Sequence, residues 1–235
     1  MKNSLIISVL AAFFAGLLIA GCTVPGENAK EGRFSISPTV QVCFAHGNVA
    51  DDGRTLCTNQ WDYGGLFGWG TGANPNLTTD DSSAYATFDD WGNYIDGGWR
   101  TLTADEWKYI LEQRPNAKEK LAGATVNDVH GLVLLPDEWT MPEGCSFNPQ
   151  ATWDANIYTA EQWNQMENNG AIFLPAAGCR YGTENPIEGK HLSYSTSTPE
   201  SGYKAVVVCC ASGLGVMTGI TTRSTGQSVR LAKDI

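Results

Sequence analysis

The cysteine at position 22 is the residue whose surroundings indicate chemistry most directly. It follows Ile19, Ala20 and Gly21, an order typical of the bacterial lipobox, where signal peptidase cuts before a cysteine that carries lipid. Lys2 supplies a positive charge ahead of the apolar run 5–20, which is short for a membrane span and is followed by polar residues. We therefore expect residues 1–21 to be a removed signal peptide and Cys22 to be acylated, with an uncleaved signal anchor as the alternative.

Six further cysteines are candidates for disulfide bonds, because an exported chain meets an oxidising compartment. They are Cys43, Cys57, Cys145, Cys179, Cys209 and Cys210. Cys43 and Cys57 flank a turn at residues 51–53 and form the easiest local pair, while the connectivity as a whole stays open. Cys209 and Cys210 are adjacent, so a strand would place them on opposite faces. Zinc is the alternative, but the sequence has no Cys-x-x-Cys pair and its three histidines are scattered, so we expect no metal.

No catalytic machinery stands out in the sequence. A Gly-x-Ser-x-Gly turn, which would support a hydrolase, does not occur. The acidic pairs Asp80-Asp81 and Asp89-Asp90 stand in loops rich in Gly and Asn, where such pairs are more often solvated turns or calcium ligands than glycosidase acids. We therefore expect neither enzymatic activity nor a cofactor.

The composition favours a loop-rich fold with an aromatic core. Eight Trp, eight Tyr and eight Phe supply large apolar surfaces, while charged residues make up only 17% of the chain. The net charge of −10 argues against nucleic acid as a partner, because binding phosphates needs clustered Lys and Arg. It also argues against a polybasic contact with lipid, so the acyl chains on Cys22 would provide the membrane anchor.

Two capping boxes predict two helices. Residues 103–106 and 159–162 each place a Thr three positions before Glu or Gln, which is the pattern of a helix start. Trp107 and Trp163 then fall on the apolar stripes of these helices, and the first pattern ends by Pro115. We expect both Trp side chains to pack in the core.

The remaining elements are strands and loops, which together with the helices predict an α+β class. Residues 22–33 read as a lipidated polar tether, and residues 34–235 as a single domain. Strands are expected within residues 34–45, at 124–126, 131–136, 171–175 and 205–210, and at a closing strand 228–231. Residues 64–98 read as long loops pinned by Trp69, Trp91 and Trp99.

A set of short motifs in fixed order resembles a known family. The motifs are Phe34-Ser35-Ile36-Ser37, Gln60-Trp61-Asp62-Tyr63, Leu66-Phe67-Gly68-Trp69-Gly70-Thr71, Trp99-Arg100-Thr101-Leu102-Thr103, Asp105-Glu106-Trp107, Gly131-Leu132-Val133-Leu134-Leu135-Pro136-Asp137, Phe173-Leu174-Pro175-Ala176-Ala177-Gly178 and Gly226-Gln227-Ser228-Val229-Arg230-Leu231. Over about residues 34–233 the chain resembles the Fibrobacter succinogenes major paralogous domain of Bacteroides-type lipoproteins. That family is similar to the C-type-lectin-like and formylglycine-generating-enzyme-like folds. The resemblance implies a small twisted antiparallel core, two helices, long loops, neighbouring termini and a role in surface recognition.

The motifs that carry chemistry in these related folds are not complete here. C-type lectins that bind sugar through calcium often use Glu-Pro-Asn and Trp-Asn-Asp. In this chain Glu184-Asn185-Pro186 has the letters in another order, and Val126-Asn127-Asp128 lacks the Trp. The formylglycine-generating relatives use reactive cysteines, but adjacent Cys209-Cys210 has the wrong spacing for two thiolates on one metal ion. Neither calcium nor that enzymatic activity is expected.

The chain departs from the family pattern near its C-terminus. The family commonly shows Tyr-Trp-Ser-Ser-Thr before its last strands, whereas residues 194–198 read Tyr-Ser-Thr-Ser-Thr. The run of small residues at 206–222 fits neither a strand nor a loop. Codon diversification by a retroelement, which targets some proteins of this lectin-like type near the C-terminus, would produce this composition in residues 203–225. Drift in a loop-facing stretch is the alternative.

We expect a ligand to bind at this C-terminal surface, because loops on a rigid scaffold concentrate recognition. Strand alternation favours the outward-facing residues Lys204, Ser212, Thr218, Ile220, Thr222 and Arg223. The expected function is that of a lipid-anchored module of the cell envelope, at the outer membrane, that recognises a protein or glycan. The alternative is a structural or assembly component of the cell surface, such as an adhesin or tip subunit.

Overall fold

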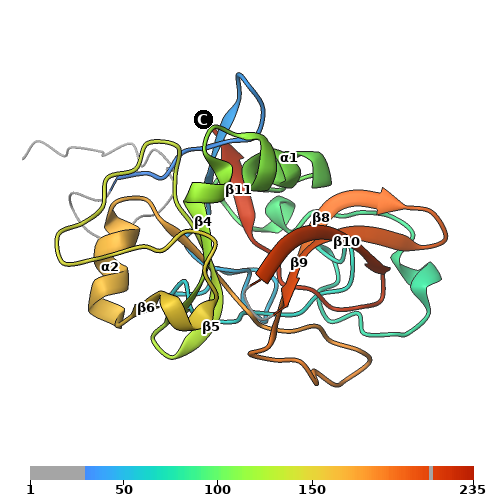
Figure 1. Ribbon diagram of the computed structural model, residues 1–235. Helices are drawn as coiled ribbons and strands as arrows, with labels where there is room; N and C mark the ends of the chain where they lie inside the picture. The colour runs from blue at the N-terminus through green and yellow to red at the C-terminus, as the bar shows by residue number, and fades with distance from the viewer. Residues whose placement is uncertain (1–29, 212–213) are drawn as a thin grey trace, which may run out of the picture.

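The computed structural model describes residues 30–211 and 214–235, so the expected signal peptide, Cys22 and Ser212 lie outside the described residues. The described chain is a mixture of small sheets, two short helices and long connections (Figure 1). The predicted α+β class is confirmed.

The first sheet joins the two ends of the folded chain. Its strand order is β1-β2-β11-β3, and the strands are β1 (Phe34–Ser35), β2 (Gln41–Phe44), β11 (Leu231–Asp234) and β3 (Arg100–Thr101). The backbone N–H of Ile235 donates to the carbonyl of Gln41 at 3.2 Å, beside the start of β2. The closing strand begins at Leu231 and not at Ser228 as expected, because Ser228 pairs instead with Tyr194 in an isolated parallel bridge.

The second sheet carries one of the two helices. Its strand order is β6-β4-β5-β7, and the strands are β6 (Ile157–Tyr158), β4 (Leu121–Val126), β5 (Val129–Leu134) and β7 (Ile172–Pro175). Asn127 and Asp128 form the turn between β4 and β5 with φ of 46° and 64°, as a two-residue hairpin turn requires. The segment that resembled part of a calcium motif is therefore a hairpin turn.

The third sheet is a three-stranded antiparallel unit of order β10-β9-β8. Its strands are β8 (His191–Glu200), β9 (Lys204–Ala211) and β10 (Leu214–Thr222). The expectation that residues 206–222 fit neither a strand nor a loop is therefore wrong. This run is rich in Val and Thr, which favour strands, and its glycines do not prevent a hairpin in which β9 supplies a central, well-paired strand.

Both predicted helices form where the capping boxes place them. In α1 (Ala104–Lys108) the hydroxyl of Thr103 accepts from the backbone of Glu106, whose carboxylate accepts from the Thr103 N–H. In α2 (Ala160–Asn168) Thr159 and Gln162 make the same exchange, and Gly170 follows the helix end with φ of 93°. The remaining helical turns are η1 (Ser82–Tyr85), η2 (Trp91–Tyr94), the π-helical η3 (Tyr109–Gln113), η4 (Ala117–Lys120) and η5 (Trp153–Ala155).

Aromatic side chains fill the core as the composition suggested. Trp107 joins the cluster between the first and third sheets, and Trp163 packs on Phe173 of the second sheet with ring centroids 5.5 Å apart. Trp69, Trp91 and Trp99 are buried and pin the long connections between β2 and β3. The expected places of all these Trp residues are confirmed.

Candidate binding surfaces

Four of the six predicted binding residues gather on one face of the third sheet. The cross-strand pairs are Thr218 with Val208, Ile220 with Val206, and Thr222 with Lys204, so alternate residues of β9 and β10 share a face. Lys204, Thr218, Ile220 and Thr222 are all exposed, and Ile220 is 61% exposed. We call these four side chains the strand surface.

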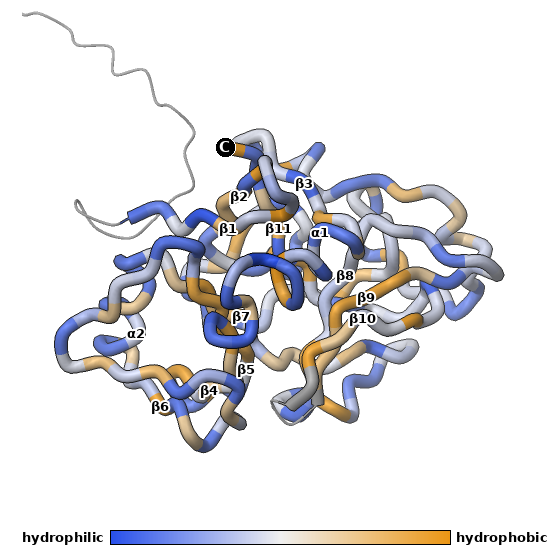
Figure 2. The backbone as a smooth tube through the Cα atoms, turned by 45° about the horizontal axis from the view of Figure 1, so that its top comes forward, coloured by the Kyte–Doolittle hydropathy of each residue, from blue (hydrophilic) through white to orange (hydrophobic). Residues whose placement is uncertain are grey.

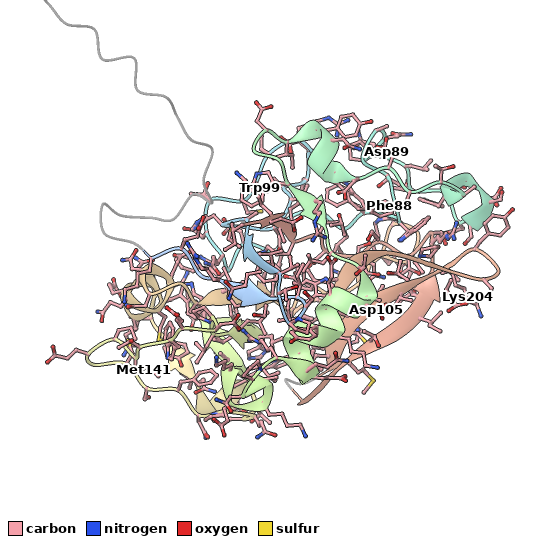
Figure 3. All side chains as sticks on the ribbon, turned by 90° about the horizontal axis from the view of Figure 1, so that it is seen from above. Phe88, Asp89, Trp99, Asp105, Met141 and Lys204 are labelled. Atoms are coloured by element: carbon pink, nitrogen blue, oxygen red, sulfur yellow. The ribbon has the colours of Figure 1, made fainter. Side chains whose placement is uncertain are left out.

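The opposite end of the same face is locked into the core. Val208 and Cys210 of β9 are buried in the cluster that contains Trp107 of α1. Figure 3 shows Asp105 of α1 above the sheet and Lys204 at the far end of it, beyond the helix. Figure 2 shows hydrophobic colouring along β9 and β10. The strand surface is therefore the part of a partly apolar face that α1 leaves open.

Arg223 is not a binding residue of this surface, which corrects the prediction. It is only 8% exposed, and its guanidinium lies 4.1 Å over the ring centroid of Trp69. It donates to the carbonyls of Tyr85 at 3.2 Å, Ala86 at 3.0 Å and Lys204 at 3.0 Å. Alternation itself places Arg223 on the opposite face from Thr222, because neighbouring residues of a strand point to opposite sides, and the N–H of Arg223 continues the pairing by bonding to the carbonyl of Tyr203. Arg223 ties the end of β10 to the long loops.

The described cysteines do not form the predicted local pair. Cys57 carries a free thiol, and its backbone N–H bonds to the carbonyl of Asn48. Burial, with a smaller contribution from Asp62, raises the pKa of Cys57 to about 11. Burial also raises the pKa of the free thiols of Cys145 and Cys179. These thiols stay protonated at neutral pH, so they are poor nucleophiles and poor metal ligands.

The two adjacent cysteines of β9 lie on opposite sides of the strand, as alternation predicted. Cys210 is buried towards α1, whereas Cys209 is half-buried on the other face and burial raises its pKa. Within the described ranges, no three His, Cys, Asp or Glu side chains gather closely enough to hold a metal ion.

The structure contains a buried polar cluster around Glu167 that no sequence motif predicted. The Nδ1 of His46 lies 2.9 Å from a carboxylate oxygen of Glu167, and the Nε2 contacts the carbonyl of Thr58. Gln60 donates to the same Glu167 oxygen and accepts from the N–H of Phe173. Burial lowers the pKa of His46, but the Glu167 carboxylate and the Thr58 carbonyl together more than offset it, so the pKa is raised overall. Because both imidazole nitrogens have partners, His46 links the loop at Thr58 to Glu167 of α2, and Gln60 extends this contact to Phe173 of β7.

A second surface, also missed from the sequence, is an open groove of about 580 Å³ between residues 51–78 and residues 180–188. We call it the loop groove. Its polar lining includes Asp51, Tyr63, Asn76, Arg180, Asn185 and Glu188. The one local signal was Glu184-Asn185-Pro186, because Asn185 of that segment lines the groove.

Hydrogen bonds hold both walls of the loop groove. The Nε of Arg180 donates to the carbonyl of Leu66 at 3.1 Å, and its Nη1 donates to Gly182 at 2.7 Å. The amide of Asn185 donates to the carbonyl of Ala177 at 2.8 Å and to the Glu188 carboxylate at 3.2 Å. Side chains that are tied to backbone in this way present a fixed array to a ligand.

The comparisons with known proteins supply no relative that suggests a function. No helix in the described ranges is both long enough and apolar enough to cross a membrane. Comparison with models of protein families, with curated proteins and with solved structures finds no match for this chain.

Proposed function

We propose that this chain is a lipid-anchored protein of the cell envelope that binds a protein or glycan ligand through the strand surface. The observation that carries the proposal is the gathering of Lys204, Thr218, Ile220 and Thr222 on an exposed sheet face. On this face Ile220 lies across from the half-buried Val206, with polar side chains on either side, and an exposed apolar area rimmed by polar residues is typical of an interaction site. The lipobox at Cys22 supports the membrane anchor.

The scaffold that we propose is C-type-lectin-like. Two short capped helices, small antiparallel sheets and long pinned connections support it. So does the pairing of the closing strand β11 with β2 near the start of the folded chain. These features agree with the resemblance in the order of motifs.

Replacing Ile220 with Asp should weaken ligand binding at least tenfold without changing the thermal midpoint. The charge would disrupt an apolar contact, while a side chain that is 61% exposed adds little to stability. The measurement is binding of the mature protein to a panel of host glycans and extracellular proteins. Met217→Asp is the matched control, because Met217 is 55% exposed on the opposite face of β10. Equal losses in both variants, or no loss in Ile220→Asp, would exclude the strand surface.

The edge position of β10 favours an assembly component as the second candidate. This strand lies at the end of its sheet and contains no charged residue from Leu214 to Thr222. Charged residues and Pro normally protect an exposed edge from pairing with another chain, and β10 has neither. An empty ligand panel, together with recovery of the chain in a larger surface assembly, would favour this function.

Replacing Cys22 with Ser should abolish lipid labelling. The hydroxyl cannot form the thioether that carries the acyl chains, and the lipobox would no longer be processed at that position. Cells that express either form are labelled with a palmitate analogue, and the labelled protein is measured against the total amount of the chain. Equal labelling of the two forms would contradict the anchor.

A further inference from the structure

We infer that the loop groove binds a neutral saccharide unit, at a site separate from the strand surface. The inference rests on the proposed role in ligand recognition, and it adds a second site and a chemical class of ligand. The groove belongs to the long connections that the core pins in place, and it has a volume of about 580 Å³. Sites for small molecules have volumes of roughly 300–1,000 Å³.

The charges that line the groove disfavour small ligands that carry a net charge. Carboxylates of Asp51 and Glu188 disfavour a phosphate or another anion, and the guanidinium of Arg180 disfavours a cation. The amides of Asn76 and Asn185 would leave polar groups unpaired against an apolar ligand. Sugar hydroxyls both donate and accept, so a neutral polyol matches carboxylate, amide and guanidinium groups at once.

Tyr63 adds an aromatic ring to this polar lining. Its hydroxyl lies 3.5 Å from the point where a side chain on Gly189 would begin, so Tyr63 stands beside the segment that carries Glu188. Burial and the nearby Glu188 carboxylate raise the pKa of Tyr63, which agrees with this placement. An apolar ring face with a polar hydroxyl suits a sugar ring, which has apolar C–H faces and a rim of hydroxyls.

The groove also keeps its shape without a ligand. Arg180 is fixed twice: its side chain bonds to Leu66 and Gly182, and its backbone exchanges two hydrogen bonds with Gly226, at 3.0 Å and 2.8 Å. A side chain at Gly226 would begin 2.8 Å from Arg180, so a close approach without Cβ is needed there. A sugar would therefore meet a wall that is already ordered, which reduces the entropic cost of binding.

The test uses the mature full-length protein in detergent and an array of neutral oligosaccharides ending in galactose, mannose, fucose or N-acetylglucosamine. Sialylated and sulfated glycans on the same array serve as anionic counterparts. The wild type should bind at least one neutral glycan, and Glu188→Gln should weaken that binding at least tenfold. Tyr63→Ala should do the same, and thermal midpoints show whether each variant is folded.

Glu184→Gln is the matched control, because Glu184 is an exposed carboxylate of the same loop that does not line the groove. Its affinity should stay within about twofold of the wild type. Binding of anionic glycans alone, an array without any binding, or unchanged affinity in folded Glu188→Gln would each overturn the inference. The Ile220→Asp variant separates the two sites: glycans whose binding falls in Glu188→Gln but not in Ile220→Asp are bound by the loop groove, and ligands with the reverse pattern are bound by the strand surface.

Discussion

Replacing Trp107 with Ala should lower the free energy of unfolding by about 3–5 kcal/mol, which is the usual cost of truncating a buried Trp. Trp107 is fully buried, and its ring lies 5.3 Å from that of Phe44 in β2. The same cluster contains Val208 of β9, so this side chain joins the first and third sheets through α1. Chemical denaturation of the mature protein, followed by far-UV circular dichroism, measures the loss.

Two further variants test whether the loss of stability comes from the buried ring of Trp107. Lys108→Ala changes an exposed neighbour on the same helix and should cost less than about 0.5 kcal/mol. Trp107→Phe should cost less than Ala, because the indole N–H has no hydrogen-bond partner among the described residues and only ring volume is lost. An unchanged denaturation midpoint in Trp107→Ala would contradict the fold.

Replacing Arg230 with Lys should cost about 3–5 kcal/mol, although the charge is kept. Arg230 is 1% exposed and donates to Asn48, to the carbonyls of Ala45 and His46, and to that of Phe173, at 2.8–3.1 Å. A single ammonium cannot reach all four acceptors, and each buried acceptor left without a partner costs about 1–3 kcal/mol. Thermal and denaturant unfolding of the purified protein give the difference.

Arg100→Lys is the control for this experiment. Arg100 also binds several oxygens, those of Glu106 and Asp234, but its side chain is 31% exposed. Exposed ion pairs contribute about 0–1 kcal/mol, so this substitution should cost far less than Arg230→Lys. Comparable losses in the two variants would show that burial of Arg230 is not the source of its effect.

The sequence predicted the elements whose signals are local. Both helix starts depend on a Thr and an acid or amide three residues later, and both form. The strands β4 and β5 were visible as two apolar runs, whereas their pairing as a hairpin is seen only in the structure. By contrast, β10 has no clear alternation of apolar and polar residues, because Thr occupies both of its faces and two glycines interrupt it, so its strand conformation depends on pairing with β9.

The candidate sites were less predictable because they depend on contacts between distant segments. Arg223 resembled an exposed cation in the sequence, yet its acceptors Tyr85 and Ala86 lie 138 and 137 positions away. The loop groove likewise forms only where residues 51–78 lie beside residues 180–188, and no pattern within either segment predicts that they come together. Alternation along β10 was sufficient for Thr218, Ile220 and Thr222, because these residues lie within a regular strand.

The place of β11 between β2 and β3 has a mechanical consequence. If a ligand held at β10 pulled against an anchor ahead of β1, tension would leave β10 through Arg223 and the segment that contains Arg230. It would then enter β11, which hydrogen-bonds to β2, and β2 pairs with β1. This route runs through the first sheet, and hydrogen bonds tie it to the second sheet and to α2: Arg230 donates to the carbonyl of Phe173 in β7, and the N–H of Lys30 donates to the carbonyl of Asn168 in α2. The first sheet would therefore bear the load directly, and the second sheet and α2 would share it through cross-connections of this kind.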